Sequence, residues 1–248
     1  MPTLAIALGL SVLGSLGGLI VASSLLLFTD SLRTRLIPWL ISYAVGALLG
    51  VSLLALLPEA LGTLDPITTF ETLLFGILLF FMLEKIVLLR HCHTDECHVH
   101  GAAAQLVLLG DAFHNFIDGA TICTAVLTSV PLGVNTAIAV AAHEIPQEVG
   151  DFAILLSAGY SRRRAMLLNL LSGLSGIAGA LLAYVTVEFL PSVKPYVLTV
   201  SSASLLYIAM SDLIPDLHRG QTDRNSIRQV ALIAAGILTV LGFEQLAH

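Results

Sequence analysis

Long apolar runs dominate the pattern of hydrophobic and polar positions along this chain. They are interrupted only by proline, glycine or short charged stretches. A helix needs about 20 apolar residues to cross the hydrocarbon core of a bilayer. The runs therefore predict an all-α, polytopic integral membrane protein with eight transmembrane helices. We expect them at Thr3–Phe28, Leu36–Leu57, Ile67–Leu89, Ala102–Leu127, Val134–Leu156, Ala165–Phe189, Val197–Ile214 and Ile227–Leu246.

The composition supports the same class. Of the 248 residues, 56% are hydrophobic and only 11% are charged, and the mean hydropathy is +0.93. Soluble domains carry about 25% charged residues, so the composition excludes an ordinary soluble enzyme, a disordered chain and a nucleic-acid-binding protein. Eight spans of about 20 residues leave only short connections. We therefore expect residues 1–248 to form a single transmembrane domain in contact with membrane lipid.

The positive charges predict an orientation. Ten of the eleven Lys and Arg residues follow the first, third, fifth and seventh expected spans, and only Lys194 lies on the other side. Loops rich in Lys and Arg stay in the cytoplasm. Both termini are therefore expected outside the cytoplasm, in a multi-pass protein of the cell membrane (the inner membrane if the source is bacterial). The ten are Arg33, Arg35, Lys85, Arg90, Arg162, Arg163, Arg164, Arg219, Arg224 and Arg228.

The fourth and fifth expected spans break the apolar pattern with nine polar side chains. An Asp at the centre of a membrane helix costs about 2.5–3.5 kcal/mol on insertion scales. Nine such groups in two neighbouring helices must therefore face each other, water or an ion. They are Asp111, His114, Asn115 and Asp118 in the fourth span, and His143, Glu144, Gln147, Glu148 and Asp151 in the fifth.

The spacing of these residues predicts a metal site. His114 and Asp118 are four residues apart, as are His143 and Gln147, so each pair shares one helical face. The two spans are antiparallel, which brings residues of equal depth together. Imidazole and carboxylate ligands favour zinc, iron, cobalt, nickel or manganese over calcium or magnesium.

Pro146 lies inside the fifth span. A proline removes one helical hydrogen bond and kinks the helix, which frees the carbonyl of Ala142 near the expected ligands. Such interruptions are tolerated in membrane helices that line a cavity.

Two segments carry a resemblance to a known family. Gly110-Asp-Ala-Phe-His-Asn-Phe-Ile-Asp-Gly119 resembles the fourth-helix motif of the ZIP family of metal-ion transporters, and His143-Glu-Ile-Pro-Gln-Glu-Val-Gly-Asp151 resembles the fifth-helix motif of its His-Glu-x-Pro-His-Glu branch. The resemblance implies influx of zinc, or of Fe²⁺, Mn²⁺, Co²⁺ or Cd²⁺, by alternating access. The metal is then cargo and not a catalytic cofactor. It also implies an inverted repeat, in which helices one to three and six to eight surround helices four and five.

The resemblance also implies a two-metal arrangement. One metal would take His114, Asp118, His143 and Gln147, and the second would take Asn115, Asp118 and Glu144, with Asp118 as the bridge. Gln147 stands where this branch has His and other branches have Glu. Because a neutral amide is a weaker ligand, the sequence leaves open whether one or two metals bind. Ala55 also departs from the family pattern, because many relatives have His at this position in the second helix. The resemblance therefore implies that one contact of this helix with the ion is lost.

Other polar residues are candidates for an additional metal site or for the ion pathway. Asp111, Glu148 and Asp151 flank the main cluster, while Asp212, Asp216 and His218 end the seventh span and predict a cytoplasmic exit route or, equally well, a solvated helix end. Asn169 and Ser172 are polar residues of the sixth span that the sequence alone does not place.

Residues 90–101 form an expected cytoplasmic loop rich in histidine and cysteine. The cytoplasm is reducing, so its cysteines should remain thiols. We expect the loop to handle metal after passage, with an incidental flexible polar loop as the alternative. Its candidate ligands are His91, Cys92, His93, Cys97, His98 and His100.

Two other functions compete with transport of a transition metal. His143 and Glu144 begin a His-Glu-x-x-His zinc-enzyme pattern, which would indicate an intramembrane protease or lipid hydrolase. However, Gln147 replaces the second histidine and Pro146 interrupts the motif. A proton or sodium carrier would leave the imidazoles and the histidine-rich loop unexplained. We therefore expect a transporter and not an enzyme, with a homodimer left open.

Overall fold

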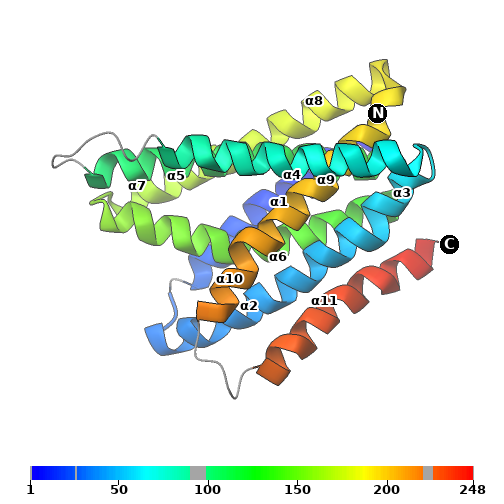
Figure 1. Cartoon of the computed structure of the whole chain (residues 1–248). Helices are drawn as coiled ribbons and strands as arrows, with labels where there is room; N and C mark the ends of the chain where they lie inside the picture. The colour runs from blue at the N-terminus through cyan, green and yellow to red at the C-terminus, as the bar shows by residue number, and fades with distance from the viewer. Residues whose placement is uncertain (1, 26, 90–98, 220–225, 248) are drawn as a thin grey trace.

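The computed structural model describes every residue except 1, 26, 90–98, 220–225 and 248 (Figure 1). Across the described residues the fold is helical and no strand occurs, which confirms the all-α class. The helices are α1 (Pro2–Leu25), α2 (Asp30–Gly50), α3 (Leu57–Leu61), α4 (Pro66–Leu89), α5 (Val99–Thr128), α6 (Val130–Ser157), α7 (Arg162–Gly173), α8 (Ser175–Phe189), α9 (Lys194–Ile208), α10 (Ile214–Arg219) and α11 (Ser226–Ala247).

Six helical segments of the described chain are long and apolar enough to cross a membrane. They are Pro2–Leu25, Thr34–Leu61, Pro66–Ile86, Arg162–Phe189, Pro191–His218 and Ser226–Phe243. The chain is therefore a multi-pass membrane protein. The two long helices outside this set are α5 and α6, which carry the polar residues described above. All eight expected segments overlap helices, and most of these helices extend a few residues beyond the expected ends. The exception at the start of the chain is α1, which ends at Leu25 and not at the expected Phe28.

Two π-helical turns carry the second and seventh expected segments past a proline. One turn, η1 (Val51–Leu56), joins α2 to α3 before Pro58, and the other, η3 (Ala209–Leu213), joins α9 to α10 before Pro215. Proline cannot donate the helical hydrogen bond and its ring crowds the preceding turn, and a π-helical turn is wider than an α-helical one. The sequence analysis ended both segments at the residue before the proline, whereas the structure continues each helix through it.

Side-chain caps define the sharp turns between helices. Ser129 alone separates α5 from α6, and its hydroxyl accepts a hydrogen bond of 3.2 Å from the Leu132 amide. Such a short link makes α5 and α6 antiparallel neighbours, as Figure 1 shows. Before α4, Asp65 accepts a hydrogen bond from the Thr68 amide at 3.0 Å. Hydrogen bonds from Thr68 hold the pKa of the Asp65 carboxyl below its usual value.

The helices pack in a consistent set of pairs. α5 packs on α8 and α6 packs on α1, while α2 packs on α11 and α9 packs on α4. The largest buried core lies around α2 and α9, where Leu48, Leu56, Leu198 and Leu205 are almost completely buried. In contrast, α4 exposes large apolar side chains such as Phe75 and Leu78.

Glycine permits the closest of these helix contacts. A Cβ atom built on Gly119 of α5 would lie only 1.9 Å from the carbonyl oxygen of Gly176 in α8. The obstacle is backbone and cannot rotate away, so this contact requires glycine. Small residues let membrane helices approach in this way.

We predict that Gly119→Ala destabilises the folded protein by about 1–3 kcal/mol, the usual cost of overpacking. Gly110→Ala is the matched control on the same helix, because a Cβ there meets nothing within 4 Å. We expect Gly110→Ala to be neutral or stabilising. Reversible unfolding in detergent would measure both variants, and equal stability of the two would contradict the packing argument.

Candidate metal centre

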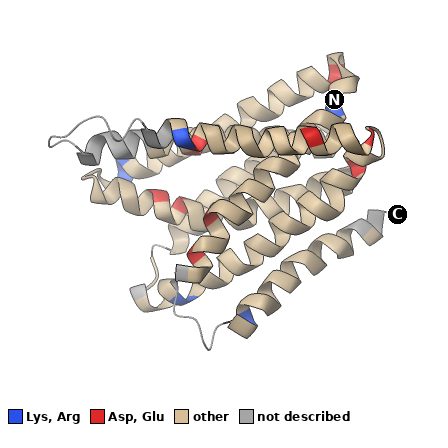
Figure 2. Ribbon diagram, viewed as in Figure 1, with Lys and Arg blue, Asp and Glu red and all other residues tan. Residues whose placement is uncertain are grey.

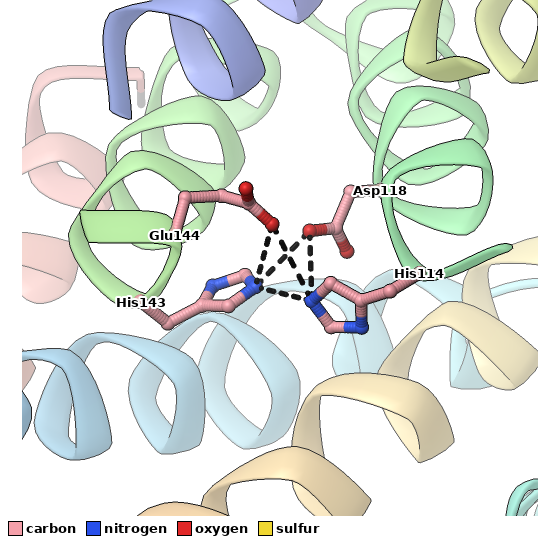
Figure 3. A group of neighbouring side chains, drawn as sticks. All are labelled: His114, Asp118, His143 and Glu144. Carbon is pink, nitrogen blue, oxygen red and sulfur yellow. Dashed lines mark hydrogen bonds and ion pairs between the residues drawn. The ribbon is translucent and has the colours of Figure 1, made fainter. Parts of the chain in front are cut away.

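Four side chains from α5 and α6 converge on one point between the helices. His114 and Asp118 come from α5, one turn apart, and His143 and Glu144 come from α6 (Figure 3). Helix α1 covers this region closely, since a Cβ on Gly18 would lie 2.8 Å from the Cβ of Glu144. Three of the four side chains are enclosed, because Asp118 and Glu144 are 0% exposed and His143 is 1% exposed, whereas the His114 side chain is 17% exposed.

The two imidazoles face each other through their Nε2 atoms, which are 2.9 Å apart. The Oδ2 atom of Asp118 lies 3.0 Å from Nε2 of His143 and 3.5 Å from Nε2 of His114. The Oε1 atom of Glu144 lies 3.5 Å from Nε2 of His114 and 3.8 Å from Nε2 of His143. The two nitrogens and two oxygens thus form one compact set, shown by the dashed lines in Figure 3.

The backbone of α6 orients the His143 ring. Its Nδ1 atom lies 3.1 Å from the carbonyl oxygen of Ala139. A carbonyl only accepts, so Nδ1 carries the hydrogen, and in the neutral ring Nε2 then presents a lone pair. Metal-binding histidines are commonly held in this way by a hydrogen bond from the second ring nitrogen.

The distances from the imidazoles to the carboxylates are close to those of a tetrahedral metal site, whereas the 2.9 Å between the two Nε2 atoms is shorter than such a site would have. Zinc binds imidazole nitrogen and carboxylate oxygen at about 2.0–2.2 Å, which places tetrahedral ligand atoms about 3.3–3.6 Å apart. The contacts between the imidazoles and the carboxylates span 3.0 to 3.8 Å. All four ligand atoms lie within 4.8 Å of one another.

The carboxylates lack other partners. None of the four oxygen atoms of Asp118 and Glu144 has a hydrogen bond among the described residues. Buried polar groups are normally hydrogen-bonded, and an unpaired buried charge is costly. A bound cation would supply the missing partner, so the residues present fit a divalent metal.

Pro146 lies inside α6, which runs as one helix from Val130 to Ser157. The proline does not break the helix. It leaves the carbonyl of Ala142 without its usual amide donor, one residue before His143 in the chain.

Gln147 and Asn115 act as hydrogen-bond donors to Asp111. The Gln147 amide donates to Oδ1 of Asp111 at 3.2 Å, and the Asn115 amide donates to the same atom at 2.9 Å. The family resemblance assigned Gln147 to the first metal and Glu144 to the second. In the structure, Glu144 is the residue that stands beside both imidazoles, because it follows His143 directly on the side of α6 that faces α5 (Figure 3).

A second group of carboxylates adjoins the first. Asp111, Glu144 and Glu148 also offer ligand atoms within 4.8 Å of one another, and all three are buried. Asp151 follows on α6 and belongs to neither group. Asn169 of α7 is fully buried, and neither polar atom of its side chain has a hydrogen-bond partner among the described residues. The only signal in the sequence was a lone Asn within an apolar run.

The remaining candidates lie apart from both groups. Asp212 is in η3 and accepts a hydrogen bond from the neighbouring Ser211 hydroxyl at 3.1 Å, while Asp216 and His218 are in α10. The structure does not bring these three residues into either group. The expected metal-binding loop cannot be compared, because His91, Cys92, His93, Cys97 and His98 lie outside the described residues and only the backbone of His100 is described.

Comparison with known proteins adds independent information. The family model described as ZIP zinc transporter matches residues 88–244. Zinc transporter ZIP13 of Pongo abelii is 35% identical over 83% of this chain and 66% of its own length, and human zinc transporter ZIP13 is 32% identical over 83% of this chain and 70% of its own.

Longer relatives are matched only in part. Human zinc transporter ZIP4 is 30% identical over 71% of this chain but 38% of its own length. Zinc transporter ZIP10 of Danio rerio is 36% identical over 56% of this chain and 17% of its own length. The chain thus spans about two thirds of the ZIP13 relatives and a smaller share of the others. The family match covers more than half of the chain, including both polar helices, and the chain belongs to the ZIP zinc transporter family.

Proposed function

We propose that this protein carries divalent transition-metal ions, zinc foremost, across the cell membrane into the cytoplasm. The observation that carries the proposal is the enclosed group of His114, Asp118, His143 and Glu144, whose ligand atoms lie within 4.8 Å of one another in a membrane protein. The relatives support it, since they are named as zinc transporters.

The ligand set suits an ion that must both bind and leave. The ion would exchange its water for two imidazoles and two carboxylates, and would regain water on the other side. No thiolate belongs to the group among the described residues. The soft thiolate ligands typical of closed structural zinc sites are therefore not involved, which favours release. Alternating access would expose the group first to one face of the membrane and then to the other.

The packing pattern supports eight spans related by an inverted repeat. In chain order, the eight spans are α1, α2 with α3, α4, α5, α6, α7 with α8, α9 with α10, and α11. An inverted repeat exchanges the first span with the sixth, the second with the seventh, the third with the eighth and the fourth with the fifth. This exchange converts each helix pair described above into another observed pair. The pair α5 and α8 becomes α6 and α1, and the pair α2 and α11 becomes α9 and α4. The two π-helical turns lie in the second and seventh helices, each before a proline, and thus also correspond. Inverted repeats around a central site are common in secondary transporters.

The charges support an orientation for a single transmembrane domain over residues 1–248. Figure 2 shows most Lys and Arg residues gathered toward one end of the bundle and one at the opposite end. Lys85 lies near the end of α4, Arg162 begins α7 and Arg228 lies in the first turn of α11, whereas Lys194 begins α9. The start of α1 and the end of α11 lie toward the end opposite the main positive charges (Figure 1). Positive charge favours the cytoplasm, so both termini would be extracytoplasmic. At the positive end, Arg228 lies over the ring of Trp39 at 4.8 Å, an arrangement typical of the membrane interface.

The pathway would continue from the central group toward the cytoplasm. Asp151 on α6 and Asp212, Asp216 and His218 near the end of the seventh span would line the exit. The loop at 90–101 would then take up the ion with its imidazoles and thiols. Lipid would surround the exposed apolar faces, and a homodimer would use part of the same surface.

The geometry favours transport over hydrolysis. A zinc hydrolase needs a general base that is free to accept a proton from metal-bound water. Glu144 would be that base, but its carboxylate stands at ion-pair distance from both imidazoles, as a ligand would. Gln147 replaces the second histidine of the enzyme motif and is hydrogen-bonded to Asp111.

We predict that His143→Ala reduces zinc uptake into proteoliposomes by at least about tenfold, because it removes a ligand that the backbone holds in place and leaves the buried carboxylates without a partner. Asn135→Ala is the matched control. It removes another buried polar side chain from α6, outside both groups, and should keep uptake within about twofold of the parent. Radiometal uptake with a panel of divalent ions is the measurement. Uptake by His143→Ala equal to that of the parent would remove the group from the mechanism.

We also predict the accessibility of single cysteines in a background that lacks Cys92, Cys97 and Cys123. Thr63→Cys, between α3 and α4, and Ser192→Cys, between α8 and α9, should react with a membrane-impermeant maleimide added to intact cells. Ser31→Cys and Ser226→Cys, at the starts of α2 and α11, should react only after permeabilisation. The reverse pattern would invert the orientation, and labelling of all four in intact cells would contradict the eight-span topology.

A further inference from the structure

We propose that Asp111, Glu144 and Glu148, together with Asn169, form a second divalent-cation site, built from oxygen ligands and adjacent to the imidazole site. This inference goes beyond the proposed function, because it concerns a different set of residues and a different class of cation. It also differs from the arrangement that the family resemblance implies, in which Asp118 bridges two metals.

The helix directions place the second group toward one end of the bundle. Asp111 lies nearly one turn before His114 on α5, and Glu148 lies one turn after Glu144 on α6. Because α5 and α6 are antiparallel, both steps lead toward the end where α5 begins and α6 ends. The proposed orientation makes this the cytoplasmic side. The two sites would therefore lie in sequence along the ion pathway.

The geometry of the carboxylates suits a shared cation. Asp111 is 3% exposed and Glu148 is 1% exposed, and their ligand atoms lie within 4.8 Å of one another and of Glu144. Oxygen ligands of a cation such as calcium lie about 2.3–2.6 Å from it, so two of them stand at most about 5.2 Å apart. Oδ2 of Asp111 and both carboxylate oxygens of Glu148 have no hydrogen bond among the described residues.

A residue of a third helix, α7, supports a cation at this position independently of the acidic residues. Asn169 of α7 is 0% exposed and lies against the carboxyl group of Glu148. Neither its oxygen nor its nitrogen has a hydrogen-bond partner that meets ordinary geometry. A buried amide without partners is uncommon in a folded protein. A cation at this position would take its oxygen as a further ligand.

Two amides orient Asp111 for this role. The side chains of Asn115 and Gln147 both donate to Oδ1 of Asp111, at 2.9 and 3.2 Å. Oδ2 is left to face a cation. Gln147 is therefore a positioning residue for the second site, and hydrogen bonds of this kind commonly hold ligating carboxylates.

The ligand chemistry separates the two sites. The first site offers two imidazoles and favours zinc or cobalt, whereas the second offers only oxygen and favours harder ions such as Mn²⁺, Mg²⁺ or Ca²⁺. Glu144 belongs to both groups, and both of its oxygens lack hydrogen-bond partners. It can thus present one oxygen to each ion, which makes Glu144 the bridge between the sites.

The test is Mn²⁺ binding to the purified full chain, stripped of metal and titrated with Mn²⁺ alone, with free Mn²⁺ counted by electron paramagnetic resonance. We expect Glu148→Gln to lose one tightly bound Mn²⁺ or to weaken it by at least about tenfold. Glu188→Gln is the matched control, because it makes the same substitution at an exposed position of α8 and should bind as the parent does. His143→Ala should retain the Mn²⁺ that Glu148→Gln loses.

Further variants keep the result interpretable if Glu148→Gln does not fold. Asn169→Leu removes the amide without changing the charge, and Asp111→Asn removes one carboxylate. Each should weaken the same Mn²⁺. The proposal is overturned if those of the three variants that fold bind Mn²⁺ as the parent does. It is also overturned if the parent binds no Mn²⁺, or if it binds a single Mn²⁺ that His143→Ala no longer binds. Zinc uptake by the parent is measured separately. If the parent takes up zinc but lacks the Mn²⁺ site, only this inference is refuted. If the parent binds Mn²⁺ at this site but takes up no zinc, only the transport function is refuted.

Discussion

The burial of acidic side chains without hydrogen-bond donors is the constraint on which this structure depends. Asp118, Glu144 and Glu148 lie inside an apolar helical bundle, and their carboxylate oxygens have no hydrogen-bond partner among the described residues. In that environment an ionised carboxylate is stable only beside a positive charge. A bound cation would supply that charge, and an exchangeable cation at the centre of a membrane protein is what the proposed carrier function needs.

The helices around the site are arranged to maintain this enclosure. Close contacts of α1 with α6 and of α5 with α8 leave no room for side chains at Gly18 and Gly119. On the other side, η1 and α9 pack together and exchange reciprocal hydrogen bonds of 2.8 Å between Ser52 and Ser202. The candidate metal centre thus lies entirely on α5 and α6, which are covered on both sides. Its ligands are held by regular helices, and such positions are more precise than positions on loops.

The sequence predicted most of this architecture, and the reasons are physical. Long apolar runs identified the six helical segments of the described chain that can cross a membrane, because the membrane allows few other structures. Polar residues such as His114 and His143 identified the site, because their cost in an apolar helix requires an explanation. The sequence could not show which polar groups point at one another, since α-helical spacing fixes a face but not a rotamer or a partner helix. For that reason only the structure shows that Glu144 lies beside both imidazoles and that Asn169 lies near Glu148. The π-helical turns before Pro58 and Pro215 were likewise not predictable, because proline alone allows either an end or a continuation.

Gln147 shows how a departure from a family motif acquires a physical meaning. Considered as a ligand, a neutral amide in place of His or Glu only weakens the site. As a donor, its amide group adds a second hydrogen bond to Oδ1 of Asp111, beside that of Asn115. A carboxylate at position 147 could not donate, and would add another negative charge beside Asp111, Glu144 and Glu148. A neutral donor instead orients one carboxylate while the charge of the group stays unchanged. In the arrangement that we propose, the glutamine therefore leaves the imidazole site to His114, Asp118, His143 and Glu144, and supports the neighbouring group of oxygen ligands.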